Sequence, residues 1–300
     1  MILDSHAHYA HNCYVQTFRY LSHSPDGYTL EEGDLDGLFQ KMEEAGIRYF
    51  IEPGIRLDSN LSVLELARRY PGKVFPAIGV HPTRAVYERW KHRRQLVPLL
   101  KTPGVVAVGE TGLDYHHDRK EQHRLRQAAW FLYQLKLAKK AKLPLILHIR
   151  DAHGHAIRIL KHHPARKNGG VVHCYNGNAK TAMDYVNLGL HLGIGGSLLQ
   201  RSRSAALEEA VRQIPLERIL VETDAPYVLP YCKDVLPPKL LRRARNSSLI
   251  LPAVIEKIAQ IKGLSPKEVE EATANNAIRL FSLPVEGEGR GKIQDTRYEI

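Results

Sequence analysis

The sequence predicts an α/β protein built as a single (β/α)8 TIM barrel. Short runs of aliphatic and β-branched residues alternate with longer, amphipathic, charge-rich stretches, which is typical of βα units on a parallel sheet. Eight such runs occur within residues 1–283, the number that a (β/α)8 barrel requires. No internal repeat or linker divides this stretch, so we expect one barrel domain over 1–283. Residues 284–300 are polar and glycine-rich and are expected to form a flexible tail.

The eight expected strands are taken in chain order. They are Ile2–Ser5, Tyr49–Glu52, Val74–Val80, Val105–Val108, Leu145–Leu147, Val171–His173, Leu190–Ile194 and Ile219–Val221. The stretch from Tyr9 to Asp36 is too long for an ordinary βα connection. We therefore expect it to form a loop decoration over the first strand.

Helices are expected between the strands. Leu61–Tyr70 is followed by Pro71-Gly72, a strong stop signal. Arg119–Lys142 repeats its apolar residues at close to 3.6 positions, with basic residues opposite. The other expected helices are Ala179–Leu188, Ser204–Ile214, Leu251–Lys262 and Pro266–Phe281.

The composition excludes several classes of protein. Hydrophobic residues make up 43% and charged residues 25% of the 300, which excludes a disordered or fibrous chain. No apolar stretch reaches the roughly 18–20 residues of a membrane span, and the first residues lack the pattern of a signal peptide. The cysteines are three, an odd number without metal-type spacing, which indicates a reducing compartment. We expect a cytoplasmic protein.

The charge balance points toward an anionic partner. Lys and Arg number 43 against 32 Asp and Glu, a formal net charge of +11. Such a field attracts polyanions such as nucleic acid, although a merely basic housekeeping protein is equally consistent with charge alone. The 16 histidines are also numerous, and histidine is the commonest metal ligand.

Ionisable side chains stand where five of the expected strands end. His6 and His8 follow the first strand and share one face, because residues i and i+2 of a strand point the same way. The other strand ends carry Glu110, His148, His173 and the pair Glu222 and Asp224. The carboxyl ends of barrel strands form the edge on which active sites are built. This edge is therefore the predicted metal site.

Imidazoles and carboxylates together suit Zn²⁺, Mn²⁺ or Mg²⁺. Two ions about 3.5–4 Å apart can stabilise both the attacking and the leaving oxygen of an in-line displacement. Such a pair needs a bridging carboxylate, for which we favour Glu110 because it comes from a central strand. Asp224 is the expected proton acceptor for the attacking water, as well as a ligand.

A series of motifs follows the expected strands in order. The motifs are His6-Ala-His8, Ile78-Gly-Val-His81-Pro82, Gly109-Glu110-Thr-Gly-Leu-Asp114-Tyr115, His148-Ile-Arg150, His173-Cys174-Tyr-Asn-Gly177, Glu222-Thr-Asp224-Ala-Pro226 and Asn275-Asn-Ala-Ile-Arg-Leu-Phe281. The series resembles that of the TatD-type metal-dependent hydrolases, TIM-barrel members of the amidohydrolase superfamily, many of which are deoxyribonucleases. The resemblance covers roughly residues 1–283, in the family's order.

The resemblance implies particular roles. One ion would be held by His6, His8, Glu110 and Asp224, and a second by Glu110, His148 and His173, with Glu110 shared. His81 would line the pocket and meet a phosphate oxygen, and Arg150 would do the same as a planar donor. Two departures stand out: Tyr9-Ala10-His11-Asn12 where the family carries a carboxylate, and Ser247-Ser248 after Asn246 where it carries Glu-Pro.

The expected function is a two-metal phosphodiesterase that cleaves DNA or a related nucleic acid through a hydroxide bridging the ions. The same site could instead hydrolyse an amide, lactone or ester of a small molecule, since one fold hosts many chemistries. A third reading is a basic nucleic-acid-binding protein with a structural metal and no turnover. Salt-sensitive binding of polynucleotide separates the first reading from the second, and site variants separate the third.

Overall fold

The computed structural model describes residues 1–200, 204–232, 236–242 and 244–284. Its main sheet has eight strands in the order β1-β4-β5-β6-β7-β8-β9-β10, and the described pairings are parallel. The strands are β1 (Ile2–Asp4), β4 (Ile47–Pro53), β5 (Val74–Ile78), β6 (Ala107–Asp114), β7 (Leu145–Arg150), β8 (Gly170–Val172), β9 (His191–Ile194) and β10 (Ile219–Val221). Every predicted run overlaps one of them, so the eight-stranded α/β fold is confirmed.

Contacts within the chain gather into two compact units. One joins Met1–Glu52 to Val171–Ala277, and the other consists of Pro53–Gly170 with the chain from Ile278 on. The predicted tail, residues 284–300, lies outside the described residues except for Pro284. No helix among the described residues is long and apolar enough to cross a membrane.

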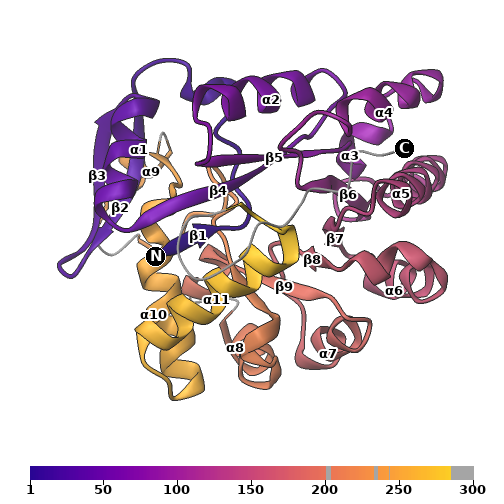
Figure 1. Cartoon of the computed structure of the whole chain (residues 1–300). Helices are drawn as coiled ribbons and strands as arrows, with labels where there is room; N and C mark the ends of the chain where they lie inside the picture. Colours follow the sequence, from indigo (N-terminus) through magenta and orange to yellow (C-terminus); the bar gives the residue numbers. More distant parts are fainter. Residues whose placement is uncertain (201–203, 233–235, 243, 285–300) are drawn as a thin grey trace. The chain divides into compact units, whose positions relative to one another are not determined.

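The first unit contains both ends of the sheet order and joins them. The N–H of Ser5, just after β1, donates to the carbonyl of Val221 in β10 at 3.0 Å, and Ala7 forms a parallel bridge with Ala225. The chain just after β1 and the strand β10 are therefore neighbours within this unit. The helices of this unit are α1 (Leu35–Glu44), α7 (Ala179–Asn187), α8 (Ser204–Gln213), α9 (Pro238–Leu241), α10 (Leu251–Lys262) and α11 (Pro266–Phe281) as far as Ala277. Helix α8 lies between α7 and α10 (Figure 1). Short 3-10 helices are η1 (Asn12–Tyr14), η4 (Gly196–Leu199), η5 (Leu216–Arg218) and η6 (Ser248–Ile250).

The stretch from Tyr9 to Asp36 is not the predicted loop decoration but contains a β-hairpin. Strands β2 (Phe18–Ser24) and β3 (Gly27–Gly33) lie side by side (Figure 1) and pair antiparallel. Strand β11 (Ala244–Arg245) pairs with β2 in parallel. The turn Pro25-Asp26-Gly27 explains the hairpin, because Gly27 adopts a φ of 110° that other residues avoid. The buried side chains of Phe18 and Tyr20, two positions apart in β2, share one face of the hairpin and make it apolar.

The second unit positions its strand ends through its longest helix, α5 (Glu121–Ala141). Gln127 of α5 accepts a hydrogen bond from the N–H of Asp114 at 2.8 Å and donates to its carbonyl at 2.9 Å. Gln134, two turns later on the same face, does the same with Val80, at 2.8 and 3.0 Å. The two glutamines are fully buried, so α5 holds the carboxyl ends of β5 and β6 in place.

The remaining helices of the second unit complete its βα pattern. They are α2 (Ser59–Arg69), α3 (Pro82–Ala85), α4 (Leu96–Leu99) and α6 (His153–His162), with 3-10 helices η2 (Trp90–Gln95) and η3 (Pro164–Asn168). All six predicted helices of the chain are confirmed, with ends displaced by at most two residues. The predicted strand Val105–Val108 begins later and runs further than expected, so Glu110 lies within β6 and not beyond it.

Candidate metal centre

The first group of possible ligands belongs to the first unit and consists of His6, His8 and Asp224. The Nε2 atoms of the two buried histidines are 3.1 Å apart. Asp224 Oδ1 lies 3.7 Å from His6 Nε2 and 3.4 Å from His8 Nε2. The N–H of Asp224 donates to the carbonyl of His6 at 2.9 Å, and its φ is 56°. Aspartate is among the residues that tolerate this left-handed conformation, which directs the carboxylate at the imidazoles.

These three donor atoms fit a divalent ion. A tetrahedral ion with metal–nitrogen bonds of about 2.0–2.1 Å holds its ligand atoms about 3.3 Å apart, close to the separations observed here. Two imidazole nitrogens facing one carboxylate oxygen are also the donor set that Zn²⁺ or Mn²⁺ prefers. The predicted pairing of His6 and His8 with Asp224 is thus present in the fold.

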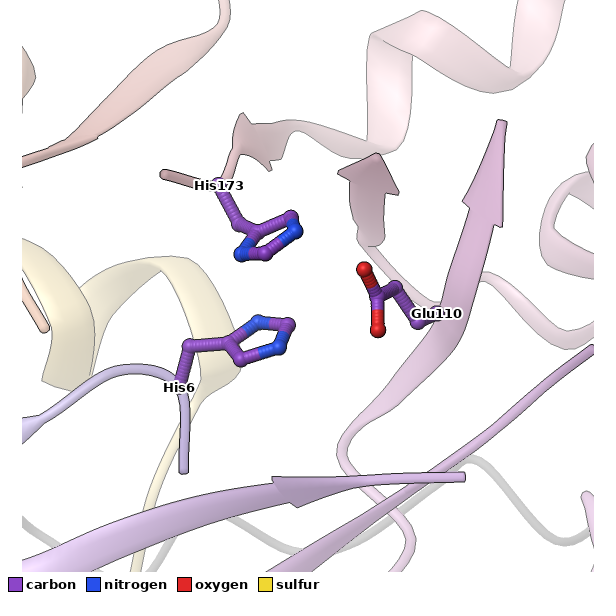
Figure 2. A group of neighbouring side chains, drawn as sticks. All are labelled: His6, Glu110 and His173. Carbon is purple, nitrogen blue, oxygen red and sulfur yellow. The ribbon is translucent and has the colours of Figure 1, made fainter. Parts of the chain in front are cut away.

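His173, at the end of β8, lies against the same group. Its ring stacks on that of His6, with centroids 3.9 Å apart and planes 13° from parallel (Figure 2). Its Nδ1 is 3.5 Å from Oε1 of Glu222, and the N–H of Cys174 donates to the same oxygen. This arrangement leaves Nε2 of His173 as the natural ligand atom, with Glu222 orienting the ring.

Glu222 occupies this position because the neighbouring strand makes room for it. Gly193 of β9 lies beneath its carboxylate, and a Cβ at Gly193 would come within 2.0 Å of Oε2. Burial raises the pKa of Glu222, while the contacts with His173 and the Cys174 N–H act in the opposite direction. A glycine on β9 is therefore needed for the orientation of His173.

The second group of possible ligands belongs to the second unit and consists of His81, Glu110 and His148. Glu110 projects from β6 (Figure 2) and is buried. Its Oε1 lies 3.0 Å from Nδ1 of His148 and 3.4 Å from Nε2 of His81. The rings of His81 and His148 are 4.2 Å apart.

The imidazole of His148 lies between two carboxylates. Nδ1 faces Glu110, while Nε2 is 3.0 Å from Oδ2 of Asp114. Ionised carboxylates only accept hydrogen bonds, so this ring needs either two protons or one proton and one metal ion. A metal ion at Nδ1 and a proton at Nε2, donated to Asp114, satisfies both sides without a charged imidazole.

Asp114 is well suited to receive that proton. Although it is buried, which raises its pKa, hydrogen bonds from His148 and from His117 bring the pKa below the ordinary range of an aspartate. The N–H groups of His116 and His117 also donate to it, at 3.0 and 2.8 Å. Asp114 thus stays an ionised acceptor that orients His148.

His81 has a different character from His148. Its Nδ1 accepts a hydrogen bond from the N–H of Thr83 at 3.2 Å, where it caps α3, and lies 2.7 Å from Oγ1 of the same residue, a hydroxyl that can donate to it. A backbone N–H can only donate, so Nδ1 carries no proton and Nε2 of the neutral ring does. His81 therefore presents an N–H donor toward Glu110, which fits a group that contacts substrate better than a metal ligand.

Behind the first group lies a buried polar network centred on Asp4. Oδ1 of Asp4 accepts from the N–H groups of His6 and Thr223, both at 3.1 Å, and Oδ2 accepts from the hydroxyls of Thr223 and Ser248, both at 2.6 Å. Burial raises the pKa of Asp4 to about 7, although these hydrogen bonds lower it. The hydroxyl of Tyr9 lies 2.7 Å from Oγ of Ser248 and accepts from its N–H at 2.9 Å. The two departures from the motif series, at Tyr9 and at Ser248, thus contact each other.

The model of one protein family, "TatD related DNase", matches residues 3–282 of the chain. The chain belongs to this family. It is 36% identical over 253 residues to the "3'-5' ssDNA/RNA exonuclease TatD" of Edwardsiella piscicida, covering 84% of this chain and 94% of that protein. The resemblance inferred from the motifs is therefore confirmed.

Solved structures of the TatD family have the same fold. The TatD homologue YJJV of Escherichia coli K12 superposes with a TM-score of 0.79 at 28% identity, covering 94% of this chain and 98% of that one. A TatD-family hydrolase of Entamoeba histolytica gives a TM-score of 0.77 at 25% identity, covering 93% and 97%. The predicted TIM-barrel architecture is thereby confirmed, and with it a metal-dependent hydrolase fold.

In this TatD-family chain, the predicted site residues lie as follows. His6, His8 and Asp224 meet in one group with His173 beside them, and Glu110 meets His148 and His81 in another. Arg150 ends β7, half-buried, in register with Asp114 of β6. The motifs quoted above contain Asp114 and Glu222, yet sequence patterns assign neither of them a role. Their positions, four residues after Glu110 and two before Asp224, are the signal that could have suggested one.

Proposed function

We propose that this protein is a two-metal phosphodiesterase that degrades single-stranded DNA or RNA. The observation that carries the proposal is the pair of imidazole and carboxylate groups with donor atoms 3.0–3.7 Å apart, in a chain of the TatD-related DNase family. Relatives that match most of the chain are named 3'-5' ssDNA/RNA exonucleases, which supports this class of substrate. The basic net charge of +11 suits the same substrate.

In this proposal, His6, His8 and Asp224 would hold one divalent ion, His148 and His173 would hold a second, and Glu110 would be a ligand of both. Zn²⁺, Mn²⁺ and Mg²⁺ are the ions that suit these donors. When bound, the ions supply Lewis-acid stabilisation of the phosphate and a nucleophilic oxygen from water at neutral pH.

The remaining steps fall to the chain's own side chains. Asp224 accepts the proton of the attacking water, because it is the carboxylate nearest to the His6 and His8 pair and is partly open to solvent. His81 donates from Nε2 to a non-bridging phosphate oxygen, and Arg150 adds a planar donor at the end of β7. Asp114 and Glu222 position His148 and His173 without contacting substrate.

The test is cleavage of end-labelled single- and double-stranded DNA, and of RNA, with Mg²⁺, Mn²⁺ or Zn²⁺ and with EDTA as a control. We expect metal-dependent cleavage of the single strands that is lost in Asp224→Asn, while the affinity for DNA stays largely intact. The product ladder distinguishes exonuclease from endonuclease action. If no ion supports cleavage by a protein shown to hold metal, hydrolysis of a small amide, lactone or ester becomes the leading function. An active Asp224→Asn variant would place the proton acceptor elsewhere.

A cytoplasmic location stays a prediction. The observation in its support is that Cys13, Cys174 and Cys232 are all free thiols.

A further inference from the structure

The connection after β5 carries a dense group of cations and aromatic rings. Residues 87–94 read Tyr-Glu-Arg-Trp-Lys-His-Arg-Arg, and we name them the basic–aromatic segment. Four of its eight residues are Lys or Arg and one is acidic. The side chains of Arg89, Lys91 and Arg94 are exposed, and so are those of Tyr87 and Trp90. Basic side chains interleaved with aromatic rings are typical of surfaces that bind single-stranded nucleic acid.

Part of the segment serves to hold it in place. The ring of Trp90 meets the buried ring of Trp130 edge to face at 5.6 Å, and the guanidinium of Arg93 lies 4.5 Å over the Trp90 ring. Arg93 also donates to the carbonyl of Trp90 at 2.8 Å. Trp90 and Arg93 thus fix η2 against α5, and the neighbouring side chains are presented from a fixed backbone.

The one acidic residue of the segment is turned inward. Oε1 of Glu88 accepts a hydrogen bond from the N–H of Leu57 at 3.2 Å, and its carbonyl accepts from the guanidinium of Arg126 at 2.9 Å. The carboxylate of Glu88 is therefore engaged by a backbone N–H within the fold. What faces solvent is positive, with the exposed residue Arg126 of α5 beside it.

Tyr87 is the most exposed large ring of the segment, at 76%. An exposed aromatic ring contributes no burial of apolar surface to the stability of the fold. Unlike Trp90, which packs on Trp130, the Tyr87 ring stands among basic residues of the segment. A nucleobase can stack on such a ring whatever its sequence, because every base has a π face.

The segment lies close along the chain to the proposed site. Tyr87 follows His81 by six residues, and six residues span at most about 20 Å even when extended. His81 in turn faces Glu110 at 3.4 Å within the same unit. A strand whose phosphate contacts His81 therefore has nucleotides within reach of Tyr87.

We propose that the basic–aromatic segment is a binding subsite for single-stranded DNA or RNA, in which a base stacks on Tyr87 while Arg89, Lys91 and Arg94 contact backbone phosphates. This rests on the proposed function, since it places further nucleotides of the same substrate. Duplex DNA keeps its bases stacked inside and cannot use Tyr87, so the subsite favours single strands.

The binding test is fluorescence anisotropy with a labelled oligothymidine in EDTA, so that nothing is cleaved. Tyr87→Ala should weaken binding about tenfold for the single strand and leave duplex affinity unchanged, and Tyr87→Phe should restore it. The combined variant Arg89→Ala, Lys91→Ala and Arg94→Ala should reduce the slope of log affinity against log salt by about 2, the value for three phosphate contacts to a single strand.

A matched control removes equal charge elsewhere on the same unit. Lys136, Lys139 and Lys140 are exposed in the last turns of α5, which lead to the amino end of β7 and not to the ligand edge. Their triple alanine variant should bind like the wild type. If it weakens binding and flattens the salt slope as much as the segment variant, only the net charge matters and the subsite is overturned.

Hydrolysis assays separate this proposal from that of the function. With metal present, the segment variants should raise KM for the oligonucleotide about tenfold and leave kcat/KM for bis(p-nitrophenyl) phosphate, which is too small to reach the segment, unchanged. If the wild type cleaves the oligonucleotide and the variants match it in KM and affinity, the subsite is wrong and the function stands. If the wild type cleaves nothing, the function fails, and the anisotropy results alone decide the subsite.

Discussion

The imidazole of His148 shows how one residue's surroundings decide its role. It lies between Glu110 and Asp114, both acceptors, whereas His81 accepts a backbone hydrogen bond at Nδ1. Two histidines beside the same carboxylate thus differ in the atom that faces it: His148 presents Nδ1, which carries no proton in this assignment, and His81 presents the protonated Nε2. His148 suits a metal ion and His81 suits a phosphate oxygen.

Asp114 tests this assignment. In Asp114→Asn the acceptor of the His148 Nε2 proton is weakened, so we expect the affinity of the second metal ion to fall about 10–100-fold. Titration of the metal-free protein with Zn²⁺ in a calorimeter measures it. Asp118→Asn in the same loop is the control, because Asp118 contacts His123 and not a proposed ligand. Equal affinity in Asp114→Asn and wild type would remove Asp114 from this role.

Glu110 is the residue on which a shared site depends. Glu110→Ala should lower the bound metal toward one ion or none, because both proposed ions lose a ligand. Metal analysis after gel filtration measures the content, and the exposed Glu65→Ala is the control. Full occupancy in Glu110→Ala would show that this carboxylate is not shared.

At the scale of elements, the alternation of apolar runs and amphipathic stretches was enough to predict the eight strands and the principal helices. The hairpin of β2 and β3 was missed because its strands are half polar, yet Pro25-Asp26-Gly27 between them is a hairpin signal. The length of β6 was underestimated because Gly109 and Gly112 have low strand propensity. Such glycines are tolerated where backbones approach: a Cβ on Gly112 would lie 2.0 Å from the carbonyl oxygen of His148.

The sequence did not reveal the orienting roles of Asp114 and Glu222, because these residues act on side chains of other strands. The proposed ligand residues stand on, or just after, strands that a repeating pattern locates. The orienting contacts of Asp114 and Glu222, in contrast, join residues far apart in the chain, and they depend on side-chain geometry that no local pattern contains.

The role of α5 can be tested at one glutamine. Gln134→Leu leaves the buried N–H and carbonyl of Val80 without their partner, so we expect the free energy of unfolding to fall by about 2–5 kcal/mol. Urea denaturation measures it. The exposed residue Gln122 of the same helix provides the control, and Gln122→Leu should stay within about 0.5 kcal/mol of the wild type. A Gln134→Leu variant as stable as the control would contradict the proposed anchoring.

For the whole molecule, composition revealed an excess of cations, although it could not tell where they gather. The net charge of +11 is spread over 300 residues, yet four of the cations stand within residues 87–94. Only the fold shows which of these cations face solvent. It also shows that the Glu88 carboxylate bonds to the N–H of Leu57 and does not pair with them.

Metal binding should also stabilise the whole molecule, because the proposed ligands are brought together only in the folded chain. An ion at 100 times its Kd adds about 2.7 kcal/mol to the stability, which raises the Tm by roughly 4 °C for a chain of this length. Differential scanning calorimetry with Zn²⁺ or with EDTA measures the difference. Asp224→Asn should show a smaller rise, and a Tm that does not respond to metal in the wild type would argue against these sites.

The division into two compact units has a consequence for the newborn chain. The unit of Pro53–Gly170 is almost continuous, so His81, Glu110 and His148 can come together soon after they leave the ribosome. His6 and His8 are made first, but their unit needs residues 171–277, and Asp224 emerges roughly 10–40 s after them. During that interval His6 and His8 are present without Asp224, the carboxylate that completes their group. The ligands that are translated first therefore belong to the group that is completed last.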